Sequence, residues 1–197
     1  MRTLVLTCAF IAGFCIMTIE LLGGKILAPY FGSSVYVWGS IITIFMLALS
    51  GGYLAGGKLS TLNPGTRTYG LLLIAAAITV LPLIFGHEWV SDQIFSVIED
   101  PRYGSLLASI ILFFIPTFIL GMISPYSIRL LIDSTASSGQ TAGFLYFVST
   151  LGSAIGTLAT SFYLVLWFEI DTVLYAVSLV LGLAGIWSLL SKRLEVA

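Results

Sequence analysis

The chain has 197 residues, of which 58% are hydrophobic and only 9% are charged, and its mean hydropathy is +1.09. A soluble globular domain does not have this balance, so the composition predicts an integral membrane protein whose main partner is the lipid bilayer. The net charge of -1 argues against the basic surface that nucleic-acid binding requires, so we expect no nucleic-acid partner.

Six segments are long and apolar enough to cross a bilayer as helices, which takes about 20 residues each. We expect these spans at Thr3–Ala28, Val35–Gly57, Thr68–Gly86, Gly104–Ile132, Gln140–Leu166 and Thr172–Leu190. The connections are short, so we expect a single all-α transmembrane domain over residues 1–197. The first span is too long for the core of a signal peptide, so we expect it to be retained.

Lysine and arginine residues indicate the orientation. With the N-terminus inside, the inner side carries Arg2, Lys58, Arg67, Arg129, Lys192 and Arg193, and the outer side carries only Lys25 and Arg102. This predicts that both termini are cytoplasmic. The outer connections carry Glu88, Asp92, Glu99, Asp100, Glu169 and Asp171. These acidic residues either cross the membrane easily as part of the loops or concentrate cationic substrates at the outer mouth.

The first span contains a carboxylate, Glu20, within its apolar run. A charge at membrane depth costs several kcal/mol unless it is paired or functional, which makes Glu20 a candidate binding residue for a cation or a coupling proton. The alternative is that Glu20 lies near the water boundary or forms a hydrogen bond with a neighbouring span. Lys25 is five residues further on and lies on another face of the same helix.

A short internal echo relates the first and fourth spans. The first ends in Leu27-Ala28-Pro29-Tyr30 and the fourth contains Ile123-Ser124-Pro125-Tyr126, each with a glycine shortly before it. Proline removes a backbone donor, so Gly23, Gly24, Pro29 and Pro125 are expected to break their helices. Interrupted helices at corresponding positions of two three-helix halves indicate an inverted repeat and a substrate site between the halves.

Other residues are predicted to bind, gate or pack. Tyr30, Trp38, Tyr53, Tyr126 and Tyr146 either belong to interfacial belts and the core or line a cavity for a cation, because aromatic faces attract ammonium groups. Arg129 is either a positive-inside anchor or one half of an inner gate with Asp133. Gly152 and Gly156 form a G-x-x-x-G that serves either packing within the chain or dimerisation.

The longest connection, residues 87–103, is predicted to hold a short surface helix. Val90, Ile94, Val97 and Ile98 fall on one arc at helical spacing, and Trp89 is expected to anchor the helix at the membrane. His87 is expected to be a solvated loop residue. Cys8 and Cys15 are expected to be free buried thiols, and no spacing indicates a metal or another cofactor.

Several blocks of residues carry a family resemblance. Residues 20–34, followed by Trp38 and by residues 51–58, together with residues 123–126 and 150–156, resemble the membrane domain of bacterial fused facilitator/spermidine-synthase-like proteins. The resemblance implies a six-helix unit similar to half of a major facilitator, a place in the bacterial inner membrane, and a link to polyamine metabolism. No glycine-rich nucleotide loop follows a strand in this chain, so enzymatic activity is not expected.

Two functional hypotheses follow. The first is a small secondary transporter of polyamines or related cationic amines, in which Glu20 binds either the cation or a coupling proton and two copies form a homodimer. The second is a membrane anchor or partner subunit for a separate aminopropyltransferase-like enzyme, which would bind the inner face around residues 58–67 and 134–139 and would transport nothing.

Overall fold

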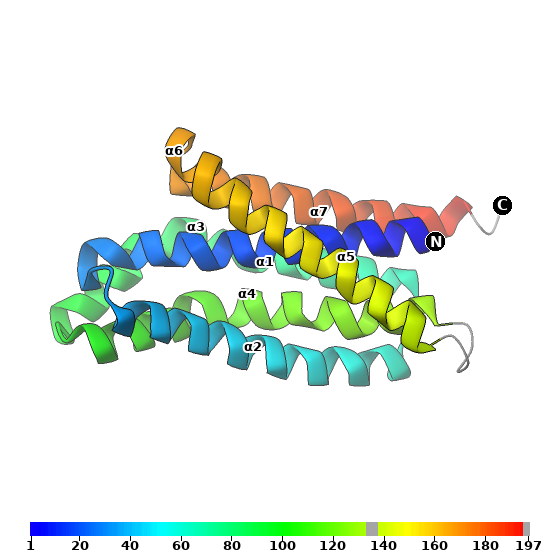
Figure 1. Cartoon of the computed structure of the whole chain (residues 1–197), viewed down its shortest axis with the longest axis horizontal. Coiled ribbons are helices and arrows are strands. Elements are labelled where there is room, and N and C mark those ends of the chain that lie inside the picture. Colours follow the sequence, from blue (N-terminus) through cyan, green and yellow to red (C-terminus); the bar gives the residue numbers. More distant parts are fainter. Residues whose placement is uncertain (133–137, 195–197) are drawn as a thin grey trace.

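The computed structural model describes residues 1–132 and 138–194, and in this part of the chain the regular structure is entirely helical. Figure 1 shows the long helices as one elongated bundle. The elements are α1 (Arg2–Phe31), α2 (Val35–Leu62), α3 (Thr66–Val97), α4 (Pro101–Leu131), α5 (Ser138–Ala159), the π-helical turn η2 (Thr160–Leu164), α6 (Val165–Trp167) and α7 (Ile170–Leu194). We call the end with Arg2 the N-terminal end and the end with Phe31 and Ile170 the far end.

In the described residues, six helical stretches are long and apolar enough to cross a membrane, and α5, η2 and α6 together form one of them. The expected all-α fold with six such helices is confirmed, and the chain is a multi-pass membrane protein. Cys8 and Cys15 are both buried free thiols in α1, as expected.

The connection that was expected between the third and fourth spans is mostly helix. α3 continues to Val97, so the short surface helix is the last part of α3 and not a separate element. The reason is packing: Ile84, His87, Ser91 and Ile94 are buried at intervals of three and four residues, which keeps one face of a single helix against the bundle. The expectation of a lone surface helix is therefore wrong.

The predicted helix breaks are also wrong. α1 runs through Gly23, Gly24 and Pro29 to Phe31, and α4 runs through Pro125 to Leu131. A proline inside a helix removes one hydrogen bond, and in a bundle the neighbouring turns and the packed helices around it can hold the helix together. The departure from regular α-helix lies directly after α5, where η2 replaces the α-helical hydrogen-bond pattern before the chain turns at Phe168.

The helix pairs with the most extensive contact are α2 with α4, α3 with α7, and α1 with α5. In Figure 1, α5 crosses the bundle obliquely from the α2 and α4 side at the N-terminal end to the α7 side at the far end. Small residues make the approaches possible. Gly70 of α3 faces Gly185 of α7, and a side chain at either position would meet the backbone of the other helix.

The G-x-x-x-G of α5 packs within the chain. A methyl group added at Gly152 or Gly156 would collide with the backbone of α1 at Phe10 or Phe14. Of the two alternatives for this motif, the structure has the intramolecular one.

A second G-x-x-x-G makes the matching contact in the α2–α4 pair. A methyl group added at Gly52 or Gly56 would collide with the backbone of α4 at Phe118 or Met122. The sequence does not indicate which helix these glycines contact, because a stripe of small residues does not specify its partner.

Candidate functional site

Glu20 is half-buried on α1 and makes no hydrogen bond or ion pair with any residue that the structure describes. Gly13 and Gly24 lie seven and four residues away, so the three positions share one face of the helix. Gly13 packs against the Ser149 backbone of α5, and Gly24 packs against the Trp38 ring of α2. Glu20 therefore lies on the strip of α1 between the contacts with α5 and with α2.

The predicted aromatic residues lie at different ends and depths of the bundle. At the far end, the Tyr30 hydroxyl donates to the backbone carbonyl of Glu88 over 3.3 Å, and its ring packs against Phe95. At the N-terminal end, Tyr126 is fully buried and its hydroxyl donates to the Asn63 carbonyl and accepts from the Gly65 N–H. Each of these two residues forms hydrogen bonds at its own end of the bundle, and the two are not close to each other.

The remaining aromatic candidates do not join them. The Trp38 ring is half-buried against Gly24. Tyr53 and Tyr146 are 47% and 54% exposed on α2 and α5, and they are near enough to interact electrostatically. The six predicted substrate-binding residues, Glu20 included, therefore do not converge on one cavity within the chain.

The predicted gating residues are packing or terminal residues in this structure. Gly23 faces the Phe113 ring, so it is a contact between α1 and α4. Arg129 is exposed in the last turn of α4, where a positive charge is favourable beside the carbonyl end of the helix. Its proposed partner Asp133 lies outside the described residues.

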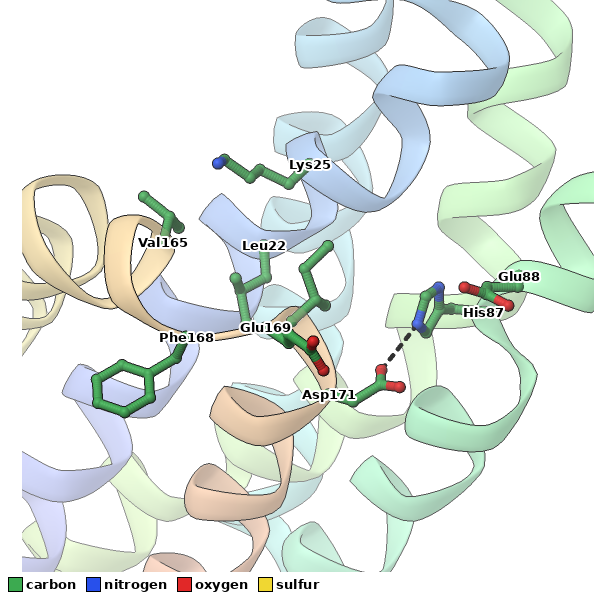
Figure 2. A pocket seen from close by; sticks show the side chains of 9 residues that line it. Leu22, Lys25, His87, Glu88, Val165, Phe168, Glu169 and Asp171 are labelled. Carbon is green, nitrogen blue, oxygen red and sulfur yellow. Dashed lines mark hydrogen bonds and ion pairs between the residues drawn. The ribbon is translucent and has the colours of Figure 1, made fainter.

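The far end contains a charged cavity of about 410 Å³. It is lined by Leu22, Lys25, His87, Glu88, Val165, Phe168, Glu169, Ile170 and Asp171. α1, α3 and the junction of α6 with α7 supply these residues (Figure 2). We call this space the far-end cavity.

His87 and Asp171 form one wall of the far-end cavity. The His87 Nε2 atom lies 3.0 Å from Oδ1 of Asp171, and the imidazole is buried whereas the carboxylate is half exposed (Figure 2). The expectation of a solvated histidine is wrong, because α3 carries His87 on its buried face. Helical spacing of Leu83, Ile84, Ser91 and Ile94 around it is the sequence signal that indicates this burial.

The other charges of the far-end cavity have no ion-pair partner in the described residues. Lys25, Glu88 and Glu169 are all exposed, and none of them lies within ion-pair distance of an opposite charge there. Figure 2 shows the Lys25 ammonium apart from the carboxylates of Glu169 and Asp171. The cavity therefore offers acceptors for a cation and, separately, one donor for an anion.

Two further cavities lie along the bundle. An almost wholly apolar one of about 280 Å³ lies between α1, the end of α5 and α7, and we call it the apolar cavity. An open one of about 550 Å³ lies at the N-terminal end between Arg2, Leu131 and Gln140. Glu20 lines none of these three cavities. The described residues hold no group of three or more His, Cys, Asp or Glu side chains suited to a metal ion.

Comparison with family models, curated proteins and solved structures finds no match to the chain. The fold and the cavities thus define the class, which is a small helical protein of the membrane with six spanning helices.

Proposed function

We propose that this chain is a small secondary transporter of polyamines or related cationic amines. In this proposal it resides in the bacterial inner membrane with both termini in the cytoplasm. The observation that carries the proposal is the pair of matched helix contacts, α1 with α5 and α4 with α2, because many transporter folds are built from inverted repeats.

The two contacts correspond position by position. In one pair Phe10 and Phe14 of α1 lie against the α5 glycines, and in the other Phe118 and Met122 of α4 lie against the α2 glycines. The helices of each pair run parallel to each other, and α4 runs opposite to α1. This arrangement supports a 3+3 inverted repeat, similar to half of a major facilitator.

The contacts suggest a different register from the one that the sequence echo suggested. Gly13 meets the Ser149 backbone and Gly121 meets the Leu49 backbone, so Gly13 corresponds to Gly121. The sequence echo had instead aligned Pro29 with Pro125.

The distribution of exposed polar residues supports a cationic substrate and a second copy. Exposed positions in the middle of α3 and α7 are apolar, as lipid contact requires: Leu71, Ile78, Phe85, Leu179, Leu183 and Ile186. α2 and α5 also expose apolar residues, among them Met46 and Leu151. In addition they expose the polar residues Thr43, Ser50, Tyr53, Tyr146 and Thr150, and Glu20 lies between these helices on α1. We infer that this polar face meets the same face of a second copy and encloses a cavity that contains the two Glu20 carboxylates.

The test is uptake of labelled spermidine into proteoliposomes. We expect saturable uptake by the natural chain and a reduction of about tenfold or more for Glu20→Gln, since a charge-assisted hydrogen bond to the cation is lost. Glu99→Gln is the matched control, because Glu99 is exposed in the connection before α4 and should leave uptake unchanged.

Two outcomes would contradict the proposal. If no polyamine shows saturable uptake, the transporter hypothesis fails. If the chain instead retains an aminopropyltransferase-like enzyme from the same cell and still carries no flux, the partner-subunit hypothesis takes its place.

A further inference from the structure

The far-end cavity and the apolar cavity are neighbours. Phe168 lines both, and Leu164 of the apolar cavity precedes Val165 of the far-end cavity in the chain. Both cavities lie where η2 and α6 end the α5 span, and the chain turns at Phe168 before α7 begins. The two cavities therefore border each other between α1 and α7, with a charged lining at the far end of the bundle and an apolar lining towards its middle.

The apolar cavity suits a hydrocarbon chain. The apolar cavity is lined mainly by Phe14, Cys15, Val173, Val177 and Val180. Its polar members include Thr18, whose hydroxyl is already bonded to the Phe14 carbonyl and to Thr160. A polar solute would lose its hydrogen bonds with water here and gain few in return, whereas an alkyl chain would lose none.

The far-end cavity suits a headgroup that carries both a positive and a negative charge. The carboxylates of Glu169 and Asp171 can accept hydrogen bonds from a cation, and the Lys25 ammonium can donate to an anion. Glu88 adds a further carboxylate, and none of these lining charges except Asp171 has an ion-pair partner in the described chain. A solute with only positive charge would leave Lys25 unused and would be repelled by it.

We propose that the two cavities form one binding site for an amine-bearing phospholipid of the phosphatidylethanolamine type. The primary ammonium binds Glu169 and Asp171, the phosphate binds Lys25, and part of one acyl chain fills the apolar cavity beside Phe168. A primary ammonium donates hydrogen bonds to these carboxylates, but the trimethylated headgroup of phosphatidylcholine has no N–H to donate. This site goes beyond the proposed transport cycle, because Glu20 does not line either cavity.

The test is lipid retention by the purified full chain, measured by native mass spectrometry after incubation with equal amounts of phosphatidylethanolamine, phosphatidylcholine and phosphatidylglycerol. We expect phosphatidylethanolamine to bind about tenfold more tightly than either competitor, because only it satisfies both charged groups. Lys25→Gln and Glu169→Gln should each remove most of this preference, whereas Glu99→Gln should preserve it. Ala176→Phe, which fills the apolar cavity from its exposed side, should weaken all three lipids alike.

Two results would overturn the site. One is equal retention of the three lipids by the natural chain. The other is an unchanged preference in both Lys25→Gln and Glu169→Gln while the thermal midpoints of these variants stay normal. O-phosphoethanolamine and spermidine serve as soluble competitors. If either of them displaces bound phosphatidylethanolamine as effectively as added phosphatidylethanolamine does, the cavity binds a free amine and the acyl chain plays no part. Since lipid retention is measured without flux, its failure is distinct from a failure of transport.

Discussion

Asp100 shows how local bonds set the behaviour of a single residue. Its carboxylate accepts the backbone N–H of Arg102 at 2.9 Å and the guanidinium at 2.6 Å, and so caps the start of α4. These bonds from Arg102 lower the pKa of the Asp100 carboxyl from 3.8 to about 2. Both residues lie before or in the first turn of α4, at the far end of the bundle.

The first prediction concerns the acid titration of Asp100. Because its pKa is lower in the folded chain, its contribution to stability is fully present above about pH 4 and is lost as the pH falls towards 2. Carbon-13 NMR of the carboxyl in micelles should give a midpoint near 2, and Arg102→Gln should return it towards 3.8. A midpoint near 3.8 in the natural chain would contradict the cap.

At the scale of single helices, the glycines decide which helices meet. Gly52 and Gly56 bring α2 onto α4, and Gly152 and Gly156 bring α5 onto α1. In lipid there is little hydrophobic force between helices, so close backbone contact of this kind supplies much of the association energy. The glycines therefore position the strip of α1 that carries Glu20.

The second prediction compares two glycines of α5. Gly156→Ala places a methyl group against the α1 backbone at Phe14, so it should destabilise the bundle by about 1–3 kcal/mol. Gly143→Ala meets no atom within 4 Å and should be neutral or stabilising by up to about 1 kcal/mol, because alanine favours the helix. Free energies of unfolding in mixed detergent micelles measure both. Equal stability of the two variants would show that the α1–α5 contact is not tight.

The π-helical turn is the second feature at this scale. η2 begins at Thr160, whose hydroxyl donates to the Thr18 hydroxyl of α1 over 3.0 Å. π-helical turns are rare and often occur at functional sites. Here the turn comes where α5 leaves α1, and both cavities of the proposed lipid site open beside it.

At the scale of the whole molecule, the charges and the two ends of the bundle agree on an orientation. The described N-terminal end carries Arg2, Lys58, Arg67 and Arg129, while the far end carries most of the acidic residues. From the positive-inside rule we propose that the N-terminal end lies in the cytoplasm, so that the far-end cavity faces the outside.

The third prediction tests this orientation by cysteine labelling. Cys8 and Cys15 are buried, so a background with both replaced by alanine should keep the fold. In intact spheroplasts a membrane-impermeant maleimide should label Glu99→Cys and should not label Thr61→Cys until the membrane is opened. The reverse labelling pattern would invert the proposed topology.

The composition alone predicted the membrane-spanning helices, because 20 or so apolar residues in a row have few other stable arrangements. The ends of the helices were harder to predict from the sequence. α3 extends well past Gly86, since the burial of His87 and Ser91 depends on neighbours that are distant in the chain. Pro29 and Pro125 were expected to break helices that packing holds intact.

For the candidate residues, too, some features can be predicted from the sequence and others require the fold. Glu20 stands out in the sequence because a carboxylate among apolar residues is costly, whatever its neighbours are. Its position between the α5 and α2 contacts needed the fold. The sequence itself contains no sign that His87 and Asp171 meet, because they lie in different helices and 84 positions apart.

The six apolar helices of this membrane protein can thus be predicted from the amino-acid order, since the free energy of each segment in lipid depends on that segment alone. The pairing of the helices, the location of the cavities and the charges that line each cavity become known only from the fold. Those features depend on the shapes and contacts of helices that are distant in the chain, and no single segment carries that information.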